Sequence, residues 1–190
     1  RAVIKWIRAA LARRCASAEV TVRIVGEAEG ADLNRRWRKR RGATNVLSFP
    51  SEGLDHAAPA FLGDIVICAP VVMREAHEQS KSPEAHWAHL IVHGVLHLLG
   101  YDHQTQRAAE AMEKLEQAIL KRVGYPNPYS GSSSKVEREA DERATRHTVA
   151  GRRGASEESQ AQGRCLLGAP RMQGDNVIRM KWKRNYVPGA

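Results

Sequence analysis

One eleven-residue stretch constrains the fold of this chain more than any other, and it reads His93-Gly94-Val95-Leu96-His97-Leu98-Leu99-Gly100-Tyr101-Asp102-His103. His93 and His97 are four residues apart, so a helix would stack both imidazoles on one face with their Cβ atoms about 6 Å apart. Gly100 can adopt a positive φ and end that helix, after which the chain can turn back. The stretch therefore predicts a helix and a returning loop that bring His103 over the same face.

Three converging imidazoles are typical of a catalytic zinc site that keeps one coordination position open. A water molecule bound at such an ion has its pKa lowered to about 7. An isolated histidine pair at this spacing is usually a coincidence, but a helix-ending glycine followed by a third histidine is a much rarer combination. We therefore expect His93, His97 and His103 to hold one metal ion per chain, with Zn²⁺ as the first candidate among the metals that imidazole ligands suit, which are Zn, Cu, Fe and Ni.

Two further side chains are expected to support these ligands from outside the coordination sphere. His89 precedes His93 by four residues and could compete as a ligand, but three imidazoles in a row on one helix face cannot surround an ion. Asp102 could orient a ligand imidazole or, equally well, be a loop carboxylate that caps a helix. The sequence leaves these two roles of Asp102 open.

The histidine spacing equals that of the metzincin peptidases, His-Glu-x-x-His-x-x-Gly-x-x-His, except at one position. Gly94 stands where those enzymes carry the glutamate that activates water and passes a proton to the leaving amine. This difference argues against proteolysis. A metzincin-like metallopeptidase nevertheless stays an alternative.

A basic segment precedes the next strand and consists of Arg35, Arg36, Trp37, Arg38, Lys39, Arg40 and Arg41. Guanidinium groups bind phosphates bidentately, and Trp37 could stack on a nucleobase. The plain alternative is a solvated loop with Trp37 in the core. Next to a metal site, the segment favours a groove for nucleic acid, with the six cations as candidate phosphate-binding residues.

Composition divides the chain near residue 129. Residues 1–129 have the apolar periodicity of a folded domain, whereas residues 130–190 are mostly polar or small and are expected to form a disordered basic tail. The formal net charge is +9, and more than half of the excess falls in the tail. No apolar run approaches the roughly 20 residues needed to span a bilayer, so no membrane association is expected.

Periodicity within the first 129 residues predicts an α+β fold, an α/β sandwich in which helices cover a small mixed sheet. Helices are expected over residues 2–14, 28–37, 70–79, 83–99 and 106–123. Strands are expected over residues 19–25, 44–49 and 61–68. The metal site would then lie on the fourth helix and the loop that follows it.

Three ordered blocks resemble the YbeY family of bacterial endoribonucleases, or rRNA maturation factors. They are the stretch from His93 to His103, Thr44-Asn45-Val46-Leu47-Ser48-Phe49-Pro50, and Gly63-Asp64-Ile65-Val66-Ile67-Cys68. The resemblance implies a zinc-dependent, single-strand-specific endoribonuclease of the cytoplasm. It further implies a role in 16S rRNA 3′-end maturation and ribosome quality control, with the small ribosomal subunit and its assembly factors as partners, and RNA as the ligand of the basic segment. A non-catalytic, zinc-stabilised ribosome-assembly module stays an alternative.

By motif position, the resemblance gives the three zinc-ligand roles to His93, His97 and His103. It gives the functional arginine to Arg38, so Arg38 and His93 are the expected catalytic residues. Members of the family usually begin with a strand before the first helix, and this chain begins at or just before that helix. The N-terminal strand is therefore expected to be missing, which would expose a sheet edge.

Overall fold

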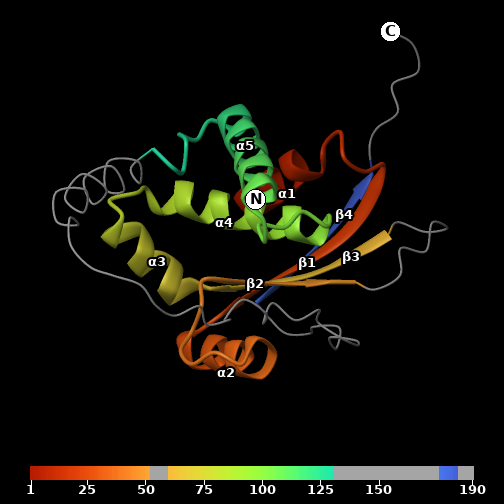
Figure 1. The fold of residues 1–190 in the computed structure, drawn as a ribbon. Coiled ribbons are helices and arrows are strands. Elements are labelled where there is room, and N and C mark those ends of the chain that lie inside the picture. The colour runs from red at the N-terminus through yellow and green to blue at the C-terminus, as the bar shows by residue number, and fades with distance from the viewer. Residues whose placement is uncertain (52–59, 131–175, 184–190) are drawn as a thin grey trace, which may run out of the picture.

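The computed structural model describes residues 1–51, 60–130 and 176–183. These residues form a twisted four-stranded sheet with helices on both faces (Figure 1). The expected α+β class, a small mixed sheet covered by helices, is confirmed.

The sheet has the strand order β2-β3-β1-β4. Its strands are β1 (Ser17–Val25), β2 (Val46–Pro50), β3 (Ala60–Cys68) and β4 (Val177–Lys183). β1 and β3 run parallel, whereas β2 pairs with β3 and β4 pairs with β1 in antiparallel fashion. At Gly63, with φ of +135°, a Cβ atom would lie 2.1 Å from the Phe49 carbonyl oxygen, so only glycine fits there.

The helices are α1 (Ala2–Leu11), α2 (Glu27–Arg38), α3 (Ala69–Glu78), α4 (Pro83–Leu98) and α5 (Gln106–Val123). α1, α4 and α5 lie on one face of the sheet, and α2 lies on the opposite face (Figure 1). α4 is the central helix of its layer, because it contacts α1, α3, α5, β2 and β3. Side chains on α4 are therefore enclosed on several sides.

Alternation along β3 divides the core into two clusters. Ile65 and Ile67 face the larger cluster under α1, α4 and α5. Val66 and Cys68 face a smaller cluster that also contains Phe49 and the α2 face. This period of two is the pattern of a strand with both faces covered.

All eight elements expected within residues 1–129 are present, with ends that differ by a few residues. The largest difference is at α1, which ends at Leu11 instead of residue 14. Ala12 leaves the helical region with ψ of 132°, and Arg13 takes a positive φ of 70°. The arginine-rich end of the expected helix is therefore a turn into β1.

The expectation of disorder over residues 130–190 is wrong for residues 177–183, which form β4. Ile178, Met180 and Trp182 alternate along this strand and pack on the larger core cluster. Residues 177–183 cannot bury enough apolar surface by themselves, but the outer edge of β1 offers them backbone partners and a core to pack on. That edge is paired, contrary to the expected exposed edge; residues 131–175 and 184–190 lie outside the described residues.

Within the described residues, no helix is both long enough and apolar enough to cross a bilayer.

Candidate metal centre

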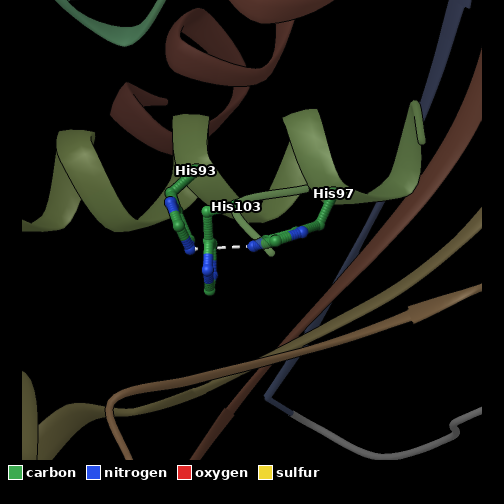
Figure 2. A group of neighbouring side chains, drawn as sticks. All are labelled: His93, His97 and His103. Atoms are coloured by element: carbon green, nitrogen blue, oxygen red, sulfur yellow. Dashed lines mark hydrogen bonds between the residues drawn. The ribbon is translucent and has the colours of Figure 1, made fainter. Parts of the chain in front are cut away.

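The candidate metal centre begins on α4, whose last two turns carry His93 and His97. The two Nε2 atoms lie 3.0 Å apart, and the ring centroids are separated by 4.5 Å. Figure 2 shows both rings projecting from the same side of the helix. The expected stacking of this pair on one helix face is what the structure has.

Gly100 ends the helix as expected and adopts a φ of +87°. The Gly100 N–H donates to the His97 carbonyl, and the Tyr101 N–H donates to the Leu96 carbonyl. These hydrogen bonds satisfy carbonyl groups that the helix end would otherwise leave without partners. The chain then reverses over the face that carries the two imidazoles.

The reversal brings His103 to the other two rings, at centroid distances of 5.8 Å from His93 and 5.1 Å from His97 (Figure 2). One ligand nitrogen from each of the three residues lies within 4.8 Å of the others, so the group could hold a metal ion. His103 is exposed, and the other two rings are half-buried, which leaves one side of the group accessible. An accessible three-imidazole group is the donor set of a catalytic rather than a closed structural zinc site.

His97 is poised to bind a metal in its neutral form. Burial lowers the pKa of His97 to about 4, and the charges of His93, His103 and Arg38 act in the same direction. A hydrogen bond with the Tyr101 backbone opposes this effect only in part. At neutral pH the ring therefore keeps the lone pair that a metal ion requires.

A buried carboxylate on α5 forms a hydrogen bond with one of the three histidines, and the sequence analysis did not identify it. Glu116 is 0% exposed, and its Oε1 accepts a hydrogen bond from His93 Nδ1 at 2.7 Å. Its Oε2 lies 3.2 Å from His89 Nε2 and also accepts the hydroxyl proton of Tyr129. Burial alone would raise the pKa of Glu116, but the hydrogen bonds outweigh it and lower the pKa to about 2.

The sequence contains a sign of this role. Glu116 lies on the same face of α5 as the buried Met112, Ile119 and Leu120, at spacings of four and three residues. A carboxylate in an apolar stripe is rare unless partners satisfy it. Its spacing alone indicates a buried, hydrogen-bonded acid, although it does not identify the partners.

His89 lies beside the three-histidine group but directs Nε2 toward Glu116. By distance alone, His89, His93 and Glu116 form a second group that could hold a metal ion, and this group shares His93 with the first. Asp102 is exposed, and its Oδ1 accepts the backbone N–H of Gln104 at 3.3 Å. This is a hydrogen bond within the loop; the helix that follows is capped by Thr105, whose side chain accepts the Ala108 N–H.

Gly94 faces the sheet. A Cβ atom at this position would lie 3.1 and 3.2 Å from carbons of Ile65 and 3.3 Å from the Ser48 hydroxyl. A glutamate side chain would have to displace the core, so the general base of a metzincin peptidase has no room here. The peptidase alternative loses its required residue for a steric reason.

The basic segment forms the last turn of α2 and the chain after it, on the other face of the sheet (Figure 1). Arg35 pairs with Asp32 at 2.8 Å, and Arg36 lies over the Trp37 ring at 5.6 Å. The Trp37 ring also packs edge-on against Phe49 at a centroid distance of 5.6 Å. Trp37 is thus partly buried and packs against the smaller core cluster, as in the plain alternative, and its contact with Phe49 occupies one side of the residue.

The remaining cations of the segment, Lys39, Arg40 and Arg41, are exposed. Arg38 is the member of the segment that acts on the metal centre electrostatically. Partial desolvation and the charge of Arg40 lower the pKa of Arg38, and the Arg38 charge in turn lowers the pKa of His97. The Arg38 charge is the smallest of the effects that lower the pKa of His97, after burial and the charges of His93 and His103.

Comparison with known proteins gives consistent matches. The family model described as Endoribonuclease YbeY matches residues 1–124. The Endoribonuclease YbeY of Nitrosococcus oceani is 54% identical over 131 residues, which cover 66% of this chain and 84% of the relative. That of Pseudomonas savastanoi pv. phaseolicola is 52% identical over 130 residues, covering 68% and 78%.

One solved structure, the solution structure of TM1509 from Thermotoga maritima, is 26% identical and matches with a TM-score of 0.46. The match covers 63% of this chain and 80% of that chain. The family match ends at residue 124, so β4 lies beyond it.

Proposed function

This chain belongs to the YbeY endoribonuclease family, and from that premise we propose that it is a metal-dependent endoribonuclease that cleaves single-stranded RNA. The observation that supports this most directly is the approach of the three imidazoles of His93, His97 and His103, whose ligand nitrogens lie within 4.8 Å of one another. Its proposed setting is the cytoplasm, in 16S rRNA 3′-end maturation and ribosome quality control. The proposed partners are rRNA, the small ribosomal subunit and its assembly factors.

We propose Zn²⁺, one per chain, as the cofactor, because three neutral imidazoles with an accessible side fit that ion. When bound, zinc supplies Lewis acidity toward a phosphoryl oxygen and lowers the pKa of a water molecule. His93, His97 and His103 would hold it, and His97 is already neutral at physiological pH. His93 is catalytic in the sense that it fixes the ion at the reacting phosphate.

Arg38 is proposed as the second catalytic residue, in the role of neutralising the scissile phosphate. Its positive charge reaches His97, and a guanidinium can bind two phosphate oxygens at once. Arg35, Arg36, Lys39, Arg40 and Arg41 would contact the RNA backbone on either side. Arg35 is the weakest candidate of these, because Asp32 already partly neutralises it.

Chelation tests the catalytic metal. The substrate is a fluorescent single-stranded RNA carrying the 3′ end of a 16S rRNA precursor, with its duplex form as a comparison. A chelator should abolish cleavage of the single strand, and added Zn²⁺ should restore it in the wild type but not in His97→Ala. Cleavage that survives both chelation and His97→Ala would refute the proposal.

A non-catalytic module with structural zinc makes a different prediction at Arg38. Arg38→Ala should leave zinc content unchanged and lower cleavage by about 10²–10³-fold, as for other groups that stabilise transition-state charge. Arg8→Ala, an exposed arginine on α1, serves as the matched control. Equal cleavage by both variants would favour the structural-zinc module.

A further inference from the structure

We propose that Glu116 is a positioning residue for the metal centre, which acts by fixing the proton of His93 on Nδ1. This inference rests on the proposed function, because it assigns a role toward the same ion. An ionised carboxylate can only accept hydrogen bonds, and Glu116 Oε1 lies 2.7 Å from His93 Nδ1. The proton must therefore be on Nδ1, which leaves the Nε2 lone pair of a neutral ring free.

The orientation of the His93 ring places its unprotonated nitrogen on the side where a metal ion would bind. His93 Nε2 lies 3.0 Å from His97 Nε2, so the free lone pair points toward the other imidazole ligands. Without Glu116, the neutral ring could carry its proton on either nitrogen, and the form protonated on Nε2 cannot bind the ion. Carboxylates that hold the outer nitrogen of a metal-bound histidine also raise its basicity.

The surroundings of Glu116 suit a carboxylate that accepts hydrogen bonds rather than one that binds the ion. Three donors converge on it, since His93 and Tyr129 donate and His89 Nε2 lies 3.2 Å away, facing an oxygen that can only accept. The residue is fully buried, whereas the accessible side of the centre is at His103. The group formed by His89, His93 and Glu116 is therefore a hydrogen-bonded support, and we do not assign a second metal to it.

Tyr129 extends the support beyond α5. The chain turns back after Gly124, and the Tyr125 hydroxyl donates to Glu84 on α4 at 2.7 Å. The Tyr129 hydroxyl then donates to Glu116, and burial together with the Glu116 charge raises the pKa of Tyr129, so it stays a donor. The segment after α5 thereby holds the carboxylate in the position that the His93 ring needs.

The test combines zinc affinity with a direct reading of the His93 proton. Zinc dissociation constants are measured by competition with a chromogenic chelator for the wild type, Glu116→Gln, Tyr129→Phe and the control Glu110→Gln, an exposed residue of α5. Long-range ¹H–¹⁵N spectra of the imidazoles report which nitrogen of His93 carries the proton. We expect Glu116→Gln to weaken zinc binding by about 10–100-fold, Tyr129→Phe to weaken it by less, and Glu110→Gln to have no effect.

We expect His93 to carry its proton on Nδ1 in the wild type and to become a mixture of the two neutral forms in Glu116→Gln. Unchanged zinc affinity in a folded Glu116→Gln would overturn the proposal. So would a proton on Nε2 in the wild type, a reading that needs no variant to fold. Loss of zinc binding by the wild type itself, with Nδ1 still protonated, would instead count against the proposed function.

Discussion

Two histidines on α4 make the same kind of hydrogen bond and are surrounded differently. His86 Nε2 lies 2.9 Å from Glu75 of α3, and His93 Nδ1 lies 2.7 Å from Glu116 of α5. In both pairs a carboxylate on a neighbouring helix accepts a hydrogen bond from a ring nitrogen. The pairs differ in the second nitrogen: His86 Nδ1 is buried with no partner among the described residues, whereas His93 Nε2 faces His97.

The carboxylates differ as well. The Glu75 side chain is 26% exposed and also accepts from Asn45 at 2.9 Å, just before β2. The Glu116 side chain is 1% exposed and is approached by three donors. An imidazole–carboxylate pair is therefore not by itself a sign of catalysis. Two features distinguish the pair of His93 and Glu116. The second nitrogen of His93 faces another candidate ligand, and three donors surround the carboxylate.

The largest expected difference between the pairs is in RNA cleavage. His93→Ala should lower kcat/KM by about 10³-fold or more, because it removes a ligand of an ion that contributes several kcal/mol. His86→Ala should stay within about threefold of the wild type, a change of under 1 kcal/mol in activation free energy. Initial rates with the single-stranded substrate at saturating zinc measure both. A similar loss in the two variants would erase the distinction.

The next difference is in folding free energy. Glu116→Ala should cost about 3–5 kcal/mol, because three donors lose their acceptor and an unsatisfied buried donor costs about 1–3 kcal/mol. Glu75→Ala should cost about 1 kcal/mol, since solvent reaches the Glu75 side chain. Urea unfolding in the presence of a chelator measures both without a contribution from metal. Equal losses would show that burial of the carboxylate does not separate the pairs.

Bound zinc should stabilise the folded protein through the pair of His93 and Glu116 and not through the pair of His86 and Glu75. At a free zinc concentration of 100 times the dissociation constant, binding to the folded state adds about 2.7 kcal/mol. Wild type and His86→Ala should both gain this stability, and His93→Ala should gain far less. Thermal unfolding with and without zinc gives the comparison, and a full gain in His93→Ala would remove that residue from the ligand set.

The smallest effects on the free energy of unfolding are expected for the residues that donate to the two carboxylates, Tyr129 to Glu116 and Asn45 to Glu75. Tyr129→Phe removes a donor to a buried charge and should cost about 1.5–3 kcal/mol. Asn45→Ala removes a donor to a partly solvated carboxylate and should cost about 0.5–1.5 kcal/mol. Chemical denaturation resolves the two. The reverse order would indicate that the Glu75 network is the more tightly held.

The approach of the three histidines could be predicted from the sequence because it depends on local geometry. His93, His97, Gly100 and His103 lie within eleven residues, and helix geometry together with one positive φ decides their arrangement. Glu116 could not be assigned in the same way. Its contact with His93 depends on how α5 packs on α4, and helical periodicity shows only that a charged residue lies on a buried face.

β4 was missed for a related reason. Val177, Ile178, Met180 and Trp182 are too few to form a core alone, and a two-stranded ribbon is marginal in water. Their burial depends on the edge of β1, whose availability cannot be inferred from the segment itself. The eight elements within residues 1–129 were predictable because each carries its own periodicity.

The pairing of β1 with β4 has a consequence for synthesis of the protein. A nascent chain emerges from its ribosome with β1 complete long before residues 177–183 are made. During that interval β1 lacks the backbone partners that β4 supplies in the folded protein, and unpaired strand edges are prone to associate with one another. A slow translational step after α5 would lengthen this exposure, so the yield of monomeric protein should depend on elongation rate and on chaperone supply.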